Sequence, residues 1–167
     1  MKEIASGVYY CGLHDKNRKL FDQLVPLPQG TTYNSYLVKG AQKCALIDTM
    51  YEKLLDPYRD MLSACGLKID YIVSNHAEPD HSGAIPTLLE AYPEAIVLCS
   101  PKCAENLSNM LGVDSSRMKV VADGEEIDLH KHNIAYIFQE YSAMEWLTVR
   151  ENVRFGLDIK GDYKNID

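Results

Sequence analysis

One stretch decides the fold: it reads Ile69-Asp70-Tyr71-Ile72-Val73-Ser74 and continues directly into Asn75-His76-Ala77-Glu78-Pro79-Asp80-His81. Its first part is the short, largely apolar run that is typical of a buried strand. Its second part places four potential metal ligands within six positions: His76, Glu78, Asp80 and His81. On an extended or loop backbone the first two ligands point the same way and the last two diverge from each other. The spacing therefore suits two neighbouring metal ions, each bound by one pair.

The same stretch has a purely structural interpretation, in which a polar turn caps the next helix through Asp80 or Ser82. A cap uses one such residue, so it does not account for two histidines that flank two carboxylates. Residues 82–84 carry no charge, which shows that the ligands form a compact cluster and not the start of an acidic run. We therefore favour the metal-binding interpretation.

Strand and helix patterns alternate along the chain, which indicates an α/β domain. The expected strands cover residues 8–10, 34–38, 45–48, 69–74, 95–99, 119–121, 127–129 and 134–138, with a turn around Gly40. The expected helices run from about Leu54 to Gly66, from a Ser82 cap past Leu89, and from Ser100-Pro101 to Leu111. Residues 13–29 are polar and rich in proline near their end, which predicts a long loop.

Length and composition are those of an ordinary globular domain: 167 residues, 46% hydrophobic and 25% charged. The net charge of −7 argues against nucleic acid or an anionic membrane as the main partner. No apolar run approaches the roughly 20 residues that a membrane helix needs, and the N-terminus lacks the apolar segment of a signal peptide. The five cysteines are odd in number and scattered, which favours free thiols in the cytoplasm.

The pattern His-x-Glu-x-Asp-His after a buried strand resembles the metallo-β-lactamase motif in the variant found in flavodiiron proteins. The resemblance also covers residues 30–37, 45–49 and 75–84, and it is good over residues 4–138. It implies an αββα sandwich of two similar halves, of which this chain supplies mainly the first. Hydrolases of the superfamily usually carry His at the third motif position and bind zinc. Glu78 offers a harder oxygen ligand there, which moves the preference toward iron.

The resemblance also implies a ligand set. His76 and Glu78 would bind the first iron, and Asp80 and His81 the second. Residues 154–161 resemble the strand that precedes the family's bridging aspartate, which makes Asp158 the counterpart of that ligand.

Two further histidines of the family have no clear counterpart. Glu145 stands at the third histidine if a two-residue insertion is accepted, and otherwise Ala143 does, which cannot bind metal. Glu145 as a ligand and Glu145 as a solvated carboxylate both remain open. The last histidine is absent, because the sequence ends nine residues after Asp158. The remaining histidines are expected at the surface: His14, His130 and His132.

Two aspartates are expected next to the metal ligands. Asp48 ends a strand near the expected cleft and should support the motif through hydrogen bonds. Asp22 follows Phe21, at a place where the family often has a histidine close to the iron pocket. It could change the polarity of the pocket, accept a hydrogen bond or have no role. Tyr33 and Asn34 are expected to order their loop.

In the family, two ferrous ions bind dioxygen or nitric oxide, and FMN on a downstream flavodoxin-like domain delivers electrons. We therefore expect residues 1–167 to form an incomplete metallo-β-lactamase-like di-iron domain that lacks the second half and the flavodoxin-like domain. The implied cofactors are two iron ions, with zinc as a substitute, and FMN on a missing domain or on a partner.

Three functions remain open. The chain is a module of an oxygen or nitric oxide reductase with a flavin or rubredoxin-type electron donor, a sensor that binds oxygen and acts on a signalling partner, or a metallo-β-lactamase-type hydrolase. Glu78 counts against the hydrolase. A bare sheet face of several hundred Å² would cost on the order of 10 kcal/mol at about 25 cal/mol/Å². A homodimer or a missing half is therefore expected to cover it.

Overall fold

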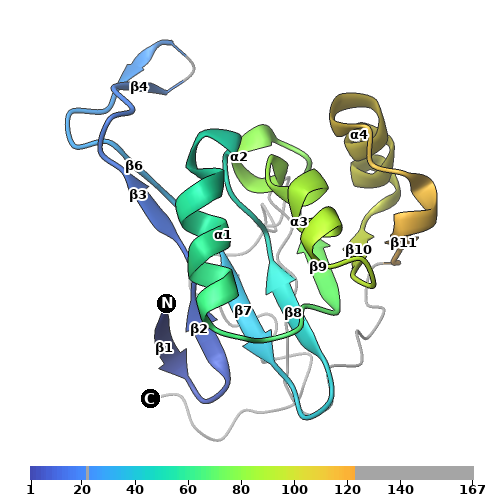
Figure 1. Ribbon diagram of the computed structural model, residues 1–167. Helices are drawn as coiled ribbons and strands as arrows, with labels where there is room; N and C mark the ends of the chain where they lie inside the picture. Colours follow the sequence, from blue (N-terminus) through green and yellow to red (C-terminus); the bar gives the residue numbers. More distant parts are fainter. Residues whose placement is uncertain (22, 123–167) are drawn as a thin grey trace, which may run out of the picture. The chain divides into compact units, whose positions relative to one another are not determined.

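The computed structural model describes residues 1–21 and 23–122. A seven-stranded sheet in the order β1-β2-β7-β8-β9-β10-β11 forms its centre (Figure 1). Its strands are β1 (Lys2–Ala5), β2 (Val8–Tyr10), β7 (Tyr36–Lys39), β8 (Cys44–Ile47), β9 (Tyr71–Ser74), β10 (Ile96–Cys99) and β11 (Met118–Val120). Neighbours from β1 to β8 are antiparallel, and those from β8 to β11 are parallel. Parallel neighbours need crossover connections, which explains why the helices appear only after β8.

Helices cover one face of this sheet (Figure 1). They are α1 (Leu55–Ala64), α2 (Pro79–Ser82), α3 (Ile85–Ala91) and α4 (Pro101–Leu111), with 3-10 turns η1 (Glu52–Leu54) and η2 (Ser115–Arg117). The main core packs alternate strand residues such as Leu46 and Ile72 with helix residues such as Leu62 and Leu88. The residues between them on the strands point to the opposite face, where Ala45 belongs to a second, small apolar cluster.

A narrow arm leaves the sheet after β2 (Figure 1). It contains the antiparallel pairs β3 (Leu13–Asp15) with β6 (Thr31–Tyr33), and β4 (Leu20–Phe21) with β5 (Val25–Pro26). The prediction of a continuous loop over residues 13–29 is therefore wrong. Both β4 and β5 are exposed, so they lack the alternation of buried and exposed residues from which a strand is recognised.

Most other expected elements are confirmed within one to three residues. The turn at Gly40 joins β7 to β8 through a 2.8 Å bond from its N–H to the Lys43 carbonyl. Gly66, with φ of 63°, follows the end of α1, and Ser100 caps α4 by accepting a bond from the Cys103 N–H. The expected strands at 127–129 and 134–138 lie outside the described residues.

Ser82 does not cap a helix, so that prediction is wrong. It is the last residue of α2, and its single hydroxyl hydrogen is shared between the carbonyls of Ala77 and Glu78, both at 2.9 Å. The following helix, α3, begins after Ala84 without a side-chain cap among the described residues. All five cysteines are free, as expected. Within residues 1–21 and 23–122 no helix is long and apolar enough to cross a membrane.

Candidate metal centre

The motif occupies a tight turn between the carboxyl end of β9 and the short helix α2. Glu78 is the residue before α2, and its side chain makes no capping hydrogen bond within the described part of the chain. The Ser82 hydroxyl instead ties the turn together by bonding back to carbonyls within it. A helix cap therefore explains neither the carboxylate of Glu78 nor the hydroxyl of Ser82.

The four predicted ligands lie in two pairs. His76 Nδ1 is 3.9 Å from Glu78 Oε2, and His81 Nε2 is 3.8 Å from Asp80 Oδ2. The two imidazole rings connect the pairs, with centroids 4.2 Å apart. The Glu78 side chain is 70% exposed, whereas the other three are between 22% and 30% exposed, so the pairs are open to solvent on the Glu78 side. Each pair offers one nitrogen and one carboxylate, a donor set that suits iron or zinc.

Each pair needs further ligands to form a closed site. Among residues 1–21 and 23–122, no three histidine, cysteine, aspartate or glutamate side chains come close enough together to bind one metal ion. Asp158, Glu145 and Asp22 lie outside the described residues, as do His130 and His132. His14 is exposed on β3, where its Nε2 lies 2.9 Å from the carbonyl of Gln29, which confirms its expected surface position.

Within the described residues, the Asp48 carboxylate has three hydrogen-bond contacts at this turn. Its Oδ1 accepts from the backbone N–H of Asn75 and its Oδ2 from the Asn75 side-chain amide, both at 2.9 Å. The same Oδ2 lies 3.3 Å from His81 Nδ1. The hydrogen bond with Asp48 raises the pKa of His81, and partial burial opposes this. A carboxylate at Nδ1 keeps the proton of neutral His81 there, so the lone pair of Nε2 is left to face Asp80 and a metal ion.

Several residues that support the turn were not singled out from the sequence. Thr49 donates twice to the His81 carbonyl, from its backbone N–H and its hydroxyl, each at 2.7 Å. At Gly83 a Cβ would stand 2.6 Å from the Pro79 carbonyl and 3.1 Å from the Glu52 nitrogen, so only glycine allows this packing. The sequence shows both residue types, but the reasons for them lie in contacts between distant segments.

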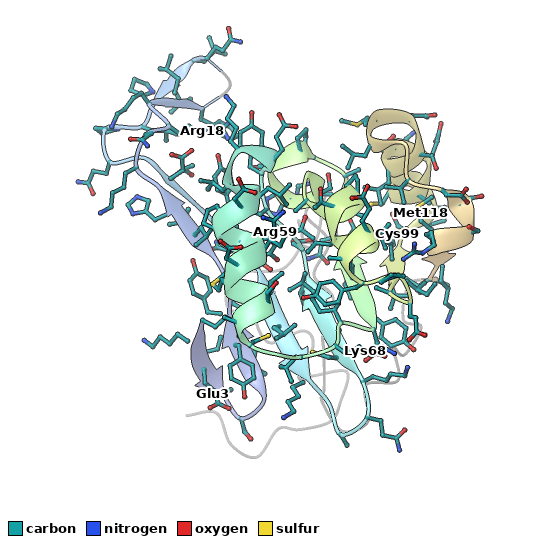
Figure 2. The ribbon with its side chains drawn as sticks, viewed as in Figure 1. Glu3, Arg18, Arg59, Lys68, Cys99 and Met118 are labelled. Carbon is teal, nitrogen blue, oxygen red and sulfur yellow. The ribbon has the colours of Figure 1, made fainter. Side chains whose placement is uncertain are left out.

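Arg18 lies in the outer part of the arm, between β3 and β4 (Figure 2). Its guanidinium donates to the Tyr33 hydroxyl at 2.6 Å and lies 5.6 to 5.9 Å from the ring centroids of Phe21, Tyr33 and Tyr51. The hydrogen bond with Tyr33 raises the pKa of Arg18, and the nearby charge of Asp80 adds to this rise. Tyr33 is thus tied to a neighbouring loop, as its expected ordering role requires.

With this geometry established, comparison with known proteins assigns the family. The model of the ODP family beta lactamase matches residues 31–145. The chain belongs to this family. It is 33% identical over 150 residues to a nitric oxide reductase of Moorella thermoacetica, covering 86% of this chain and 36% of that protein.

Solved structures extend the comparison. A flavodiiron protein from Giardia intestinalis superposes with a TM-score of 0.72 at 27% identity, covering 78% of this chain and 32% of that one. The rubredoxin oxygen:oxidoreductase of Desulfovibrio gigas gives 0.70 at 30% identity, covering 77% and 32%. The metallo-β-lactamase-like α/β fold and the resemblance to flavodiiron proteins are therefore confirmed. The chain spans only about a third of the length of these proteins.

Proposed function

We propose that the turn from His76 to His81 belongs to a non-haem di-iron centre that binds or reduces dioxygen or nitric oxide. The observation that carries this proposal is the arrangement of two imidazole–carboxylate pairs on one turn, joined by histidine rings 4.2 Å apart. Two similar proteins, a nitric oxide reductase and a rubredoxin oxygen:oxidoreductase, support it.

In this proposal each pair serves one metal ion. His76 and Glu78 would bind the first, Asp80 and His81 would bind the second, and Asp158 would be a ligand that both share. Glu145 is the candidate for a further ligand of the first ion. The donor set of the turn contains nitrogen and oxygen but no thiolate, which suits iron and also admits zinc as a substitute.

When bound, the iron pair supplies the redox chemistry and the coordination positions for oxygen or nitric oxide. The residues of the chain orient the ligands. Asp48 holds the proton of His81 on Nδ1, away from the metal side. Thr49 holds the backbone of His81 in place by donating to the His81 carbonyl, and Gly83 lets the turn pack against residues 50–52.

FMN on a further domain or on a partner chain, fed by a flavin or rubredoxin-type donor, would reduce the metal centre. A second half or a second copy of the chain would complete the sandwich, because the similar structures extend well beyond the part that this chain matches. The five free cysteines support a cytoplasmic location.

Metal analysis of anaerobically purified protein tests the assignment first. We expect iron in the wild type and about half as much in Glu78→Ala, because one pair loses its carboxylate. Glu90→Ala is the matched control, since Glu90 is an exposed glutamate on α3 outside the turn. Full metal content in a His76→Ala/His81→Ala double variant would refute the site.

Stopped-flow mixing separates the functions. Reduced, iron-loaded protein should react with oxygen or nitric oxide and give a new charge-transfer absorption band. Repeated turnover with an added reduced flavoprotein identifies a reductase module, whereas a stable adduct that does not turn over identifies a sensor. Hydrolysis of a β-lactam or thioester by the zinc form, without any reaction of the iron form with oxygen, would establish the hydrolase instead.

A further inference from the structure

A chain of hydrogen bonds connects the interior of α1 to the metal-binding turn. It starts at Tyr58, which is fully buried and whose hydroxyl oxygen lies 2.7 Å from the Ser35 hydroxyl oxygen. Ser35, also fully buried, donates to the backbone carbonyl of Asp48 at 3.0 Å. A serine hydroxyl carries one hydrogen, and the carbonyl can only accept it. The direction of the chain is therefore fixed: Tyr58 donates to Ser35, and Ser35 donates to Asp48.

Asp48 needs this support because its backbone is strained. Its φ of 51° lies in the left-handed region, which costs a non-glycine residue about 1–3 kcal/mol. The conformation is fastened on both sides: the Asp48 N–H donates to the Val73 carbonyl at 2.8 Å, and its carbonyl accepts from Ser35. In this conformation the carboxylate bonds to Asn75 and lies 3.3 Å from His81 Nδ1.

We propose that Tyr58 and Ser35 are positioning residues of the metal centre, which act on His81 through the backbone and carboxylate of Asp48. Among the side-chain hydrogen bonds of the described residues, those of Tyr58 and Ser35 go to each other and to Asp48, so both would otherwise count as ordinary core residues. Their hydroxyl groups differ from core packing in one respect: they hold a strained carbonyl whose release turns the Asp48 carboxylate away from His81. The statement about metal affinity rests on the proposed function, whereas the orientation of His81 does not.

Two substitutions break the chain at different bonds. Ser35→Ala deletes the bond to the Asp48 carbonyl, and Tyr58→Phe deletes only the hydroxyl and keeps the ring in the core. Ser108→Ala is the matched control, because Ser108 makes the same kind of bond to the Val113 carbonyl at the end of α4, at 3.0 Å. Ser35→Thr, which keeps a hydroxyl, is the conservative variant expected to rescue.

Two measurements on the whole chain test the proposal. In a titration with cobalt(II), followed by its visible absorption, we expect about tenfold weaker binding for Ser35→Ala and severalfold weaker binding for Tyr58→Phe, with Ser108→Ala unchanged. In the metal-free protein, at an alkaline pH where His81 is neutral, nitrogen NMR should show the proton on Nδ1. Ser35→Ala should give a mixture of both tautomers, and Ser35→Thr should restore the wild-type pattern.

The outcomes separate the two proposals. Wild-type cobalt affinity and an unchanged His81 tautomer in both variants would overturn the positioning role and leave the metal centre standing. Absence of cobalt binding by the wild type would refute the metal centre, and the tautomer comparison would still decide the positioning role. If Ser35→Ala does not fold, Tyr58→Phe gives the same two readouts without a change in packing.

Discussion

Strands β8 and β9 are joined by an aspartate at each end, and the two ends differ. At the carboxyl end, Asp48 follows β8 and accepts the N–H of Asn75, which follows β9. At the amino end, Asp70 precedes β9 and accepts the N–H of Cys44, the first residue of β8. Both bonds measure 2.9 Å. Asp48 therefore connects the carboxyl ends of the two parallel strands, and Asp70 connects their amino ends.

The two aspartates differ in the contacts of their second carboxylate oxygen, and this difference distinguishes a structural end of the strand pair from a functional one. The other oxygen of Asp70 lies 2.9 Å from Lys43 Nζ, in an ion pair with this half-exposed lysine. The other oxygen of Asp48 accepts a hydrogen bond from the Asn75 side-chain amide and lies 3.3 Å from His81 Nδ1. In the described part of the chain only Gln23 and Asp48 are non-glycine residues with a positive φ. An aspartate that only holds two strands together needs neither a strained backbone nor a histidine partner. Asp48 has both, which marks its end of the strand pair as the functional one.

The largest effect is expected from Asp48→Ala. It leaves the half-buried Asn75 N–H without its carboxylate acceptor and puts alanine in a left-handed conformation. We expect the free energy of unfolding to fall by about 3 kcal/mol, measured by denaturant titration. Asp48→Asn keeps an oxygen for Asn75 and tolerates the left-handed region better, so it should lose about half as much. An effect of Asp48→Ala no larger than that of Asp70→Ala would remove the proposed difference between the two ends.

A smaller effect is expected from Asp70→Ala, about 1–1.5 kcal/mol in the same measurement. Water can replace part of the lost contact, because the partner lysine is 47% exposed. Cobalt affinity should stay at the wild-type value, since Asp70 lies at the opposite end of β9 from the turn. A loss of metal binding in Asp70→Ala would show that the metal centre depends on the alignment of the whole strand pair.

We also expect Asp70 to make the free energy of unfolding depend on pH, by less than about 1 kcal/mol. Burial alone would raise the pKa of Asp70, but hydrogen bonds from Lys43 and the Cys44 N–H outweigh it and lower the pKa below its ordinary value of 3.8. The folded state therefore releases the Asp70 proton more readily than the unfolded state. The stabilisation is fully present above pH 3.8 and is lost as the pH falls through the folded pKa. The stability difference between wild type and Asp70→Asn should stay constant near neutral pH and shrink in acid.

The sequence predicted the residues at the carboxyl end of this strand pair far better than the hydrogen bonds that hold them in place. The apolar run before Asn75 and the spacing of the four ligands are local patterns, so they indicated β9 and the turn directly. Asp48 was expected to support the turn, but its left-handed backbone was not. The bonds from Tyr58 and Ser35 join residues 23 and 13 positions apart, and such pairs leave no periodic signal. The Ser82 prediction failed for a different, local reason: its hydroxyl bonds back to the carbonyls of Ala77 and Glu78, five and four positions earlier, instead of forward to a helix N-terminus.

The smallest effect is expected on the arm, far from both aspartates. Leu24, between β4 and β5, is 82% exposed, so truncation removes almost no buried surface. Leu24→Ala should change the free energy of unfolding by less than about 0.5 kcal/mol. The matched control Leu88→Ala, at a fully buried leucine of α3, should cost about 2–5 kcal/mol. Leu20, Phe21 and Val25 are also exposed, at 42% to 54%, so the arm tip carries four of the exposed large hydrophobic side chains of the described residues. A loss above about 1 kcal/mol in Leu24→Ala would therefore show that the arm packs against a further segment or a second copy of the chain.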